Sequence, residues 1–386
     1  MMEVYDLKDI LDMGSAYGLT LNPKIERRCV NGIWGMYATD TITDGEVLVS
    51  SHTPNLIEAS DTLEYLTKCA IEFEMGDKSK MYPWFRSIGE IDSYKNDSVY
   101  YISDDELDTI KLLSPIIAHK IKLYNNRISD VVSKMESEHN IQRETAELMA
   151  LISESRKWDV GFMPVFDLFN HSLKRGNPMY KVTADNGDTW LFLARGVYNK
   201  GDEIFVSYSV KDTLKYSLGF NFYNESDIHM IDITSRLLFK INDELDEAIL
   251  KKLKESYSIT QHTDISAYSI NKPIMLVDGA PSADLIKLVE SISYNSIEDF
   301  NNNNISYEKF DTIMLDWLTS ASHKTDIVKI NEDGGIPVDK ITPLVERFIL
   351  LINKERTLIE KGFEWVIGNS NVFPNRFLTQ LLPKLV

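Results

Sequence analysis

The chain has 386 residues, of which 43% are hydrophobic and 26% are charged. This length allows two or three domains at roughly 100–200 residues each, and the ordinary globular composition excludes a disordered or fibrous protein. The formal net charge of −18 argues against binding to a phosphate backbone, which needs clustered cations. It suits a basic protein partner, although acidity also keeps a protein soluble. No apolar run reaches the ~18–20 residues of a membrane span.

The N-terminal residues MMEVYDLKDILDMG are acidic and lack the basic start of a signal peptide. We therefore expect a soluble, cytoplasmic protein that binds neither nucleic acid nor membrane. The two cysteines, Cys29 and Cys69, stand far apart and match neither a disulfide framework nor a tetrahedral zinc site. Reduced, buried thiols and no metal ion are expected.

The predicted elements alternate between helices and strands. Residues 4–13 have one apolar face and end before Gly14, which predicts a short helix. Residues 25–60 contain β-rich runs broken by Asn31-Gly32 and Asp44-Gly45, which are turn signals, and predict three short strands. Helical spacing follows over 61–155, strands return at about 163–210, and the pattern from about 225 onward is helical. Within that last part, residues 296–305 are predicted as an exposed loop.

The two β-rich segments are far apart in the sequence. Neither has enough strands to bury a face alone, so we expect them to join in one small β domain. This arrangement predicts an α+β fold, with a helical insertion between the β segments and an all-α C-terminal domain.

Two motifs combine glycine or arginine with aromatic residues. In Gly32-Ile33-Trp34-Gly35 the glycines let backbone groups approach a ligand closely, although a glycine turn in a hairpin is the commoner reason for such a pattern. It is not a dinucleotide fingerprint, because no helix follows. In SRKW (155–158), Arg156 is either a bidentate partner for a ligand carboxylate or a surface arginine.

Two further motifs lie in the second β-rich segment. In DLFNHS (167–172), Asn170 and His171 either bind a polar ligand or fix a turn. No second His or Cys stands at ligand spacing, so a metal site is not predicted. EIFVSY (203–208) ends in Tyr208, and a tyrosine at a strand end usually packs and finds one partner for its hydroxyl.

Together, the order and spacing of these motifs resemble the SET-domain methyltransferases. The similar branch contains the Rubisco large-subunit lysine methyltransferase and the actin-histidine methyltransferase. NGIWGMYATDTITDGEVLV resembles its G-x-G-L-x-A…G-E-x-L segment, SRKW its S-R-x-F, DLFNHS its D-x-x-N-H-S and GDEIFVSY its G-E-x-x-x-x-Y-G. SKMYPWFRSIG is similar to part of its helical insertion, and PIMLVDGAPSADLIKLVE to the start of its C-terminal substrate-binding domain. The likeness runs over nearly the whole chain.

The resemblance implies a domain organisation and a cofactor. Residues 1–60 and 151–230 would form the catalytic SET core, a small knotted β domain, with 61–150 as a helical insertion. Residues 231–386 would form a helical substrate-binding domain. S-adenosylmethionine would be held by Gly32, Ile33, Trp34, Arg156, Asn170 and His171, with Arg156 at its carboxylate end. Tyr208 would be the catalytic tyrosine beside the transferring methyl, and the substrate channel would be lined by Trp158, Asp167 and Tyr180.

The implied activity is that of a protein-lysine N-methyltransferase, acting as a monomer on a target lysine of a non-histone protein. The chain lacks the Cys-rich segments that flank many histone-directed members. A protein-histidine N-methyltransferase is the first alternative, but members acting on histidine carry a small polar residue where this chain has Trp158, whose aromatic wall favours a lysine stem. A non-catalytic SET-fold binding module is the second, and the intact motif residues argue against it. Leu218 and Ser209 depart from the pattern, so the number of methyl groups transferred is not predicted.

Overall fold

The computed structural model describes residues 7–15, 18–52, 57, 59–88, 94–95, 97–158, 161–184, 187–208, 213–223, 227–232, 251, 259–262, 267–270, 275–321 and 340–369. The chain divides into two compact units. The first comprises Met1–Asp104, Ile117–Val210 and Tyr216–Asp227, and the second comprises Asp105–Ile116, Lys211–Lys215 and Ile228–Val386. Both units are therefore assembled from segments that are far apart in the sequence.

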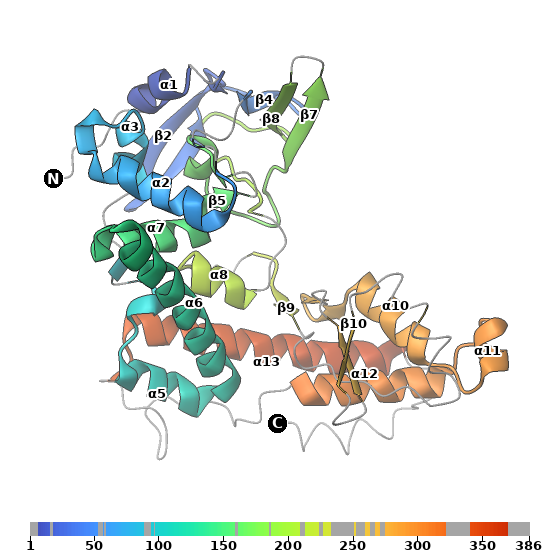
Figure 1. The fold of residues 1–386 in the computed structure, drawn as a ribbon. Helices are drawn as coiled ribbons and strands as arrows, with labels where there is room; N and C mark the ends of the chain where they lie inside the picture. Colours follow the sequence, from blue (N-terminus) through green and yellow to red (C-terminus); the bar gives the residue numbers. More distant parts are fainter. Residues whose placement is uncertain are drawn as a thin grey trace. The chain divides into compact units, whose positions relative to one another are not determined.

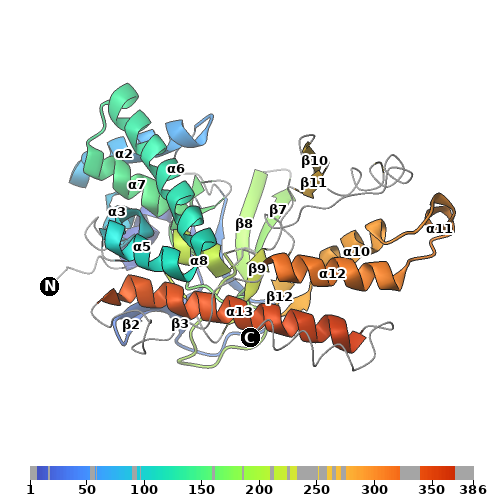
Figure 2. The same cartoon turned by 90° about the horizontal axis from the view of Figure 1, so that it is seen from below.

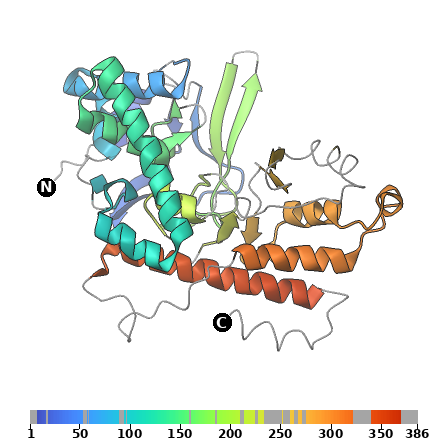
Figure 3. The ribbon, with the colours of Figure 1, turned by 60° about the horizontal axis from the view of Figure 1, so that its bottom comes forward.

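A four-stranded antiparallel sheet in the first unit has the order β1-β4-β8-β7. Its strands are β1 (Thr20–Leu21), β4 (Val47–Ser51), β8 (Gly187–Leu193) and β7 (Met179–Ala184). In the pairing of β4 with β8, Ser50 lies opposite Leu191. The prediction that the two β-rich segments share one domain is thereby confirmed. Strands β7 and β8 form a long hairpin (Figure 3).

A second hairpin of the first unit joins β2 (Ile25–Val30) to β3 (Ile33–Ala38) (Figure 1). Its turn consists of Asn31 and Gly32, whose φ angles of 53° and 82° are the left-handed values that a two-residue hairpin turn requires. The short strands β5 (Lys157–Trp158) and β6 (Gly161–Phe162) form a third pair. The Asn31-Gly32 pair, which the sequence predicts as a turn, therefore forms the turn of this hairpin in the structure.

The segment 203–208, predicted as a strand, makes isolated bridges instead of a continuous ladder. Glu203 bridges Tyr37 of β3, and Val206 bridges His171 and Asn177. The backbone N–H of Val206 donates to the Asn170 carbonyl at 2.9 Å, and the N–H of Ser172 donates back to Val206 at 3.1 Å. The segment thus changes partners along its length, which prevents a regular strand and holds residues 170–172 beside it.

Helices make up most of the remainder of the first unit: α1 (Leu7–Ser15), α2 (Thr62–Glu74), α3 (Tyr82–Ile88), α6 (Pro115–His139) and α7 (Arg143–Arg156). Single 3₁₀ turns occur at η1 (Gly76–Lys78), η2 (Val99–Tyr101) and η3 (Phe166–Leu168). Helix α2 starts where the Asp61 carboxylate accepts from the N–H of Glu64 at 2.9 Å. Residues 4–6 of the predicted first helix lie outside the described residues. The sheet strands enclose an apolar core that includes Met36, Val49, Phe166 and Phe192.

The second unit is mainly helical and also contains short strands. Its helices are α5 (Asp104–Leu113), α10 (Ala283–Ile292), α11 (Ile297–Asn301), α12 (Tyr307–Ala321) and α13 (Pro343–Asn369), and α8 (Thr213–Gly219) begins in it. Helices α12 and α13 lie side by side (Figure 2) and share a buried core with α10. The strands β9 (Met230–Asp232), β12 (Met275–Val277) and β13 (Ala280–Pro281) form one sheet, and β10 (Ile259–His262) and β11 (Ala267–Ile270) form a hairpin.

The predicted loop at 296–305 contains helix α11. The Ser296 hydroxyl accepts from the N–H of Asp299 at 3.1 Å, which is an N-cap contact, and Asn303 has a left-handed φ of 53° shortly after the helix ends. Ser296 therefore marks the start of helix α11, and Asn303 follows its end. In the described part of the chain, no helix is both long and apolar enough to cross a membrane.

Candidate active site

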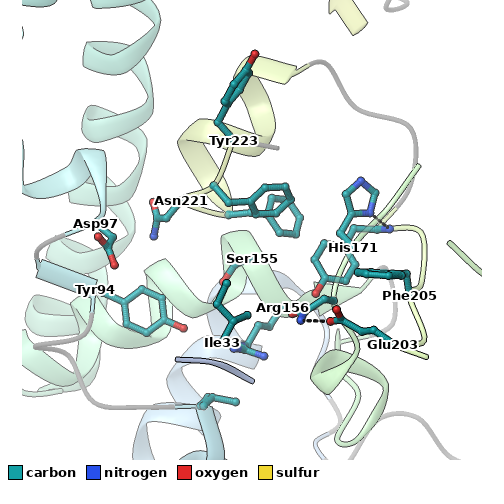
Figure 4. Close-up of a pocket in the computed structure, with 15 residues that line it drawn as sticks. Ile33, Tyr94, Asp97, Ser155, Arg156, His171, Glu203, Phe205, Asn221 and Tyr223 are labelled. Carbon is teal, nitrogen blue, oxygen red and sulfur yellow. Dashed lines mark hydrogen bonds between the residues drawn. The ribbon is translucent and has the colours of Figure 1, made fainter. Parts of the chain in front are cut away.

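A cavity of about 650 Å³ lies within the first unit. This volume is in the range of roughly 300–1,000 Å³ that small-molecule sites occupy. Its walls come from the start of β3, the end of α3, residues 94 and 97, the end of α7, residues 170–171, residues 203–208 and residues 220–223. Figure 4 shows Tyr94 and Asp97 on one side of the cavity, and His171, Phe205 and Glu203 on the other.

Tyr208 is held in the cavity wall by contacts at both ends of the residue. Its hydroxyl donates to the Phe169 carbonyl at 2.6 Å, and its backbone N–H donates to His171 Nδ1 at 3.0 Å. Its ring stacks on Phe220 at 5.1 Å, and Trp158 meets it edge-on at 6.2 Å. Burial raises the pKa of Tyr208 to about 12, although Arg156 opposes the rise. The hydroxyl therefore stays protonated at neutral pH, and it acts as a fixed dipole rather than as a base.

His171 also lines the cavity, and its ring holds Tyr208 in place. Because Nδ1 accepts the hydrogen bond from the backbone of Tyr208, the neutral ring carries its proton on Nε2. The ring stacks on Tyr208 at 5.0 Å and packs on Tyr216 at 4.6 Å. These contacts fix the ring of His171 and the backbone of Tyr208.

Arg156, at the end of α7, supplies a positive charge to the cavity. One guanidinium nitrogen donates to the Asp167 carbonyl at 2.8 Å and lies 3.8 Å from the Asp167 carboxylate. Burial lowers the pKa of Arg156, but the nearby Tyr94 and Asp167 outweigh it, and the net shift is upward. Its buried Nε atom has no hydrogen-bond partner among the described residues. Arg156 is therefore a permanent cation with hydrogen-bonding capacity left unused.

Asp167 lies behind Arg156 and does not line the cavity. Its Oδ2 accepts from Trp84 Nε1 at 3.0 Å, whereas its buried Oδ1 has no partner in the part of the chain that the structure describes. Burial raises the pKa of Asp167 to about 6, and Arg156 works against that rise. The carboxyl group holds the arginine in place from the protein side.

Asn170 contacts two other segments of the cavity wall through its side-chain amide. Its Nδ2 donates to the Trp34 carbonyl at 2.9 Å and to Glu203 Oε1 at 2.7 Å. Gly35 makes this approach possible, because a Cβ atom at that position would lie 2.5 Å from Glu203 Oε1 and 3.0 Å from Asn170 Nδ2. The second glycine of the Gly32–Gly35 motif is thus the one that leaves room for the site.

The structure places the predicted site residues in several settings. Those that line the cavity are Ile33, Arg156, Asn170, His171 and Tyr208. Trp34 contributes its carbonyl to Asn170, and Trp158 packs against Tyr208. Neither tryptophan lines the cavity, and nor do three further residues: Gly32 in its hairpin turn, Asp167 behind Arg156, and Tyr180 on β7, where its side chain is 46% exposed.

Sequence reasoning missed several lining residues. Glu203 stands inside the recognised GDEIFVSY motif but was not selected as a site residue, and Phe220 lies outside every motif that was recognised. Tyr94, Asp97 and Asn221 belong to no motif, and nothing in their local pattern distinguishes them. Only the folded chain brings them to the cavity.

No protein-family model matches the chain, and no curated protein matches its sequence. Solved structures do match. The SET domain of LSMT bound to lysine and AdoHcy is 13% identical, with a TM-score of 0.57 over 97% of this chain and 95% of that one. Rubisco LSMT bound to AdoMet is 11% identical, with a TM-score of 0.57 over 98% and 99%. Rubisco LSMT bound to sinefungin and monomethyllysine is 12% identical, with a TM-score of 0.54 over 98% and 99%.

The chain therefore has the SET-domain fold of Rubisco LSMT over nearly its whole length. This confirms the predicted α+β fold class and the resemblance to that branch of SET-domain proteins. At identities of 11–13%, these structural matches establish the fold alone. The activity is argued from the cavity itself.

Proposed function

We propose that the protein is an S-adenosylmethionine-dependent N-methyltransferase that modifies a lysine of a non-histone protein. One observation carries the proposal: a half-buried, protonated Tyr208, a half-buried Arg156 and the Asn170–Glu203 pair converge on one cavity of a SET fold. The solved neighbours support it, because LSMT is bound to AdoMet in one structure and to lysine and AdoHcy in another.

The residues of the cavity fit such a cofactor. Arg156, with its unused buried Nε, suits a carboxylate, and Asn170 and Gly35 form a close-fitting polar wall. Phe205 and Phe220 offer aromatic surface for a nucleoside. When bound, S-adenosylmethionine supplies an activated methyl group on a positively charged sulfur.

The chain's own contribution is positioning and desolvation. The Tyr208 hydroxyl is fixed by the Phe169 carbonyl at 2.6 Å, so both oxygens are preorganised at one place in the wall. A lysine must be neutral to attack, and at a pKa of ~10.4 this costs about 4.6 kcal/mol at pH 7. The buried aromatic surroundings of Tyr208, including Trp158, lower that cost because they disfavour the ammonium form.

Residues 231–386 are proposed to dock the protein substrate. The second unit also includes Asp105–Ile116, so a fragment ending at residue 230 would separate α5 from the rest of its unit. The test therefore uses the full chain. Tyr307→Ala on α12 (58% exposed) and Leu350→Ala on α13 (44% exposed) should lower kcat/KM for the protein substrate but not for a short lysine peptide. Leu123→Ala, an exposed residue of α6, is the matched control. Equal losses with protein and peptide would contradict docking by these helices.

The activity itself is tested by incubating the protein with methyl-labelled S-adenosylmethionine and a cell lysate. We expect transfer of label to a protein in the lysate, and cofactor binding that calorimetry detects without any substrate. A protein that binds no S-adenosylmethionine would instead be a docking module with the SET fold. Transfer without measurable cofactor binding would place the reaction outside this cavity.

A further inference from the structure

Glu203 lies in the cavity wall, held by the backbone on both sides. The N–H of Ala38 donates to the Asp202 carbonyl at 2.9 Å, and the N–H of Ile204 donates to the Met36 carbonyl at 2.8 Å. These bonds fix residues 202–204 against β3. Figure 4 shows Glu203 at the cavity. Its carboxylate accepts a hydrogen bond from Asn170 Nδ2 at 2.7 Å.

This contact determines how the carboxamide of Asn170 is oriented. Its two neighbours, the Trp34 carbonyl at 2.9 Å and the Glu203 carboxylate at 2.7 Å, are both hydrogen-bond acceptors. Only the Nδ2 side of the amide can face them, and both of its hydrogens are then used. The amide oxygen Oδ1 is left as an acceptor, and no described residue donates to it.

Glu203 also carries a negative charge into the cavity wall. Burial and the nearby Glu203 carboxylate raise the pKa of the Tyr37 hydroxyl. Gly35 leaves the space that the carboxylate occupies, since a Cβ there would approach Oε1 to 2.5 Å. The same cavity holds the cation of Arg156. The cavity therefore presents the positive charge of Arg156, and it also presents the negative charge of Glu203 next to the acceptor Oδ1 of Asn170.

This pattern complements an amino-acid zwitterion, which carries a carboxylate and an ammonium on one carbon. We propose that Glu203 is a positioning residue that fixes Asn170 Oδ1 as the acceptor for the ammonium of the cofactor's amino-acid end, and that its charge favours that ammonium. The inference rests on the proposed function. It assigns to Glu203 a role toward one end of the ligand and none toward the nucleoside.

Two ligands distinguish a role of Glu203 toward the amino-acid end from a role in shaping the whole cavity. S-adenosylhomocysteine contains both the nucleoside and the amino-acid end, whereas 5′-methylthioadenosine contains the nucleoside alone. Calorimetry on the full chain compares wild type with Glu203→Ala, which removes the contact, and Glu203→Gln, which keeps an acceptor for Asn170 but loses the charge. Asp202→Asn is the matched control, because this neighbouring acid does not line the cavity.

We expect Glu203→Ala to weaken S-adenosylhomocysteine binding by about 10- to 100-fold, the range for a buried polar group that loses its partner. Glu203→Gln should weaken it by about 3- to 10-fold, because a charge-assisted hydrogen bond is roughly twice as strong as a neutral one. Both variants should bind 5′-methylthioadenosine within about 2-fold of wild type, which also shows that they are folded. Asp202→Asn should bind both ligands as wild type does.

An equal loss of both ligands in Glu203→Gln would overturn the inference, because Glu203 would then shape the whole cavity. Unchanged S-adenosylhomocysteine affinity in both variants would overturn it as well. If wild type binds 5′-methylthioadenosine and S-adenosylhomocysteine with equal affinity, the amino-acid end has no recognition site and the inference fails while the nucleoside site stands. If wild type binds none of these ligands or S-adenosylmethionine, the proposed function fails first.

Discussion

Tyr208→Phe removes one hydroxyl group and leaves the ring in place. In the structure that hydroxyl donates to the Phe169 carbonyl at 2.6 Å, while the ring is held by Phe220 at 5.1 Å and His171 at 5.0 Å. The ring packing is unchanged by the substitution, so the loss of stability should be limited to about 1–3 kcal/mol for the buried carbonyl left without its donor. The backbone N–H contact with His171 remains.

Turnover should suffer much more than ligand binding. Removing one preorganised polar group that acts mainly in the transition state typically lowers kcat by about 10²–10³-fold. Arg156 and Asn170 remain in the cavity, so cofactor affinity should stay within about 2-fold of wild type. Such a split identifies a group that acts on the reacting atoms.

The assay is single-turnover transfer from methyl-labelled S-adenosylmethionine, together with calorimetry of S-adenosylhomocysteine. Tyr216→Phe is the matched control, because the ring of this tyrosine also packs on His171, at 4.6 Å, but does not line the cavity. It should keep most of the activity. Equal rates for Tyr208→Phe and wild type would remove Tyr208 from the mechanism, and a parallel loss of affinity and rate would make its role structural.

Three further substitutions test the site. Asn170→Ala should weaken S-adenosylmethionine binding by roughly 1–3 kcal/mol in calorimetry; a lower melting temperature with unchanged affinity would make Asn170 structural. Gly35→Ala forces a Cβ to within 2.5 Å of Glu203 Oε1, so it should lower both Tm and cofactor affinity, and normal binding would refute the close fit. Burial raises the pKa of Asp167 from 3.8 to about 6, so the folded state binds the proton more tightly than the unfolded state and gains stability as the pH falls through 6. The free energy of unfolding of wild type, relative to Asp167→Asn, should therefore rise by up to about 3 kcal/mol between pH 7 and 4, at ~1.36 kcal/mol per unit, and a constant difference in denaturant titrations would contradict this.

Local signals in the sequence predicted the turns, and the small number of strands in each β-rich segment predicted that the two segments share one domain. Asn31-Gly32 forms the expected hairpin turn because two residues with left-handed φ suit an Asn-Gly pair. The joining of β4 and β8 was predictable from the need of two short β segments to bury a shared face. The local pattern of 203–208 is that of a strand, but its bridges to β3 and to residues 171 and 177 depend on tertiary structure that periodicity does not contain.

The candidate site was predictable only where the chain carries a recognisable motif. Arg156, Asn170, His171 and Tyr208 stand in such motifs, and all of them line the cavity. Which atoms they use depends on partners that no pattern identifies: the carbonyl of Phe169 for the Tyr208 hydroxyl and the carboxylate of Glu203 for Asn170. Tyr94 and Asp97 could not be predicted, since no motif surrounds them in the sequence.

The chemical nature of the acceptor tests the central claim most directly. The full chain is incubated with S-adenosylmethionine carrying a deuterated methyl group and a lysate, and tandem mass spectrometry then locates the label on the modified protein. The account predicts a labelled methyl on the side-chain nitrogen of a lysine in a non-histone protein, with the signal lost in Tyr208→Phe. Label on a histidine ring would contradict lysine as the target, and no label from a protein that binds the cofactor would contradict catalysis at this cavity.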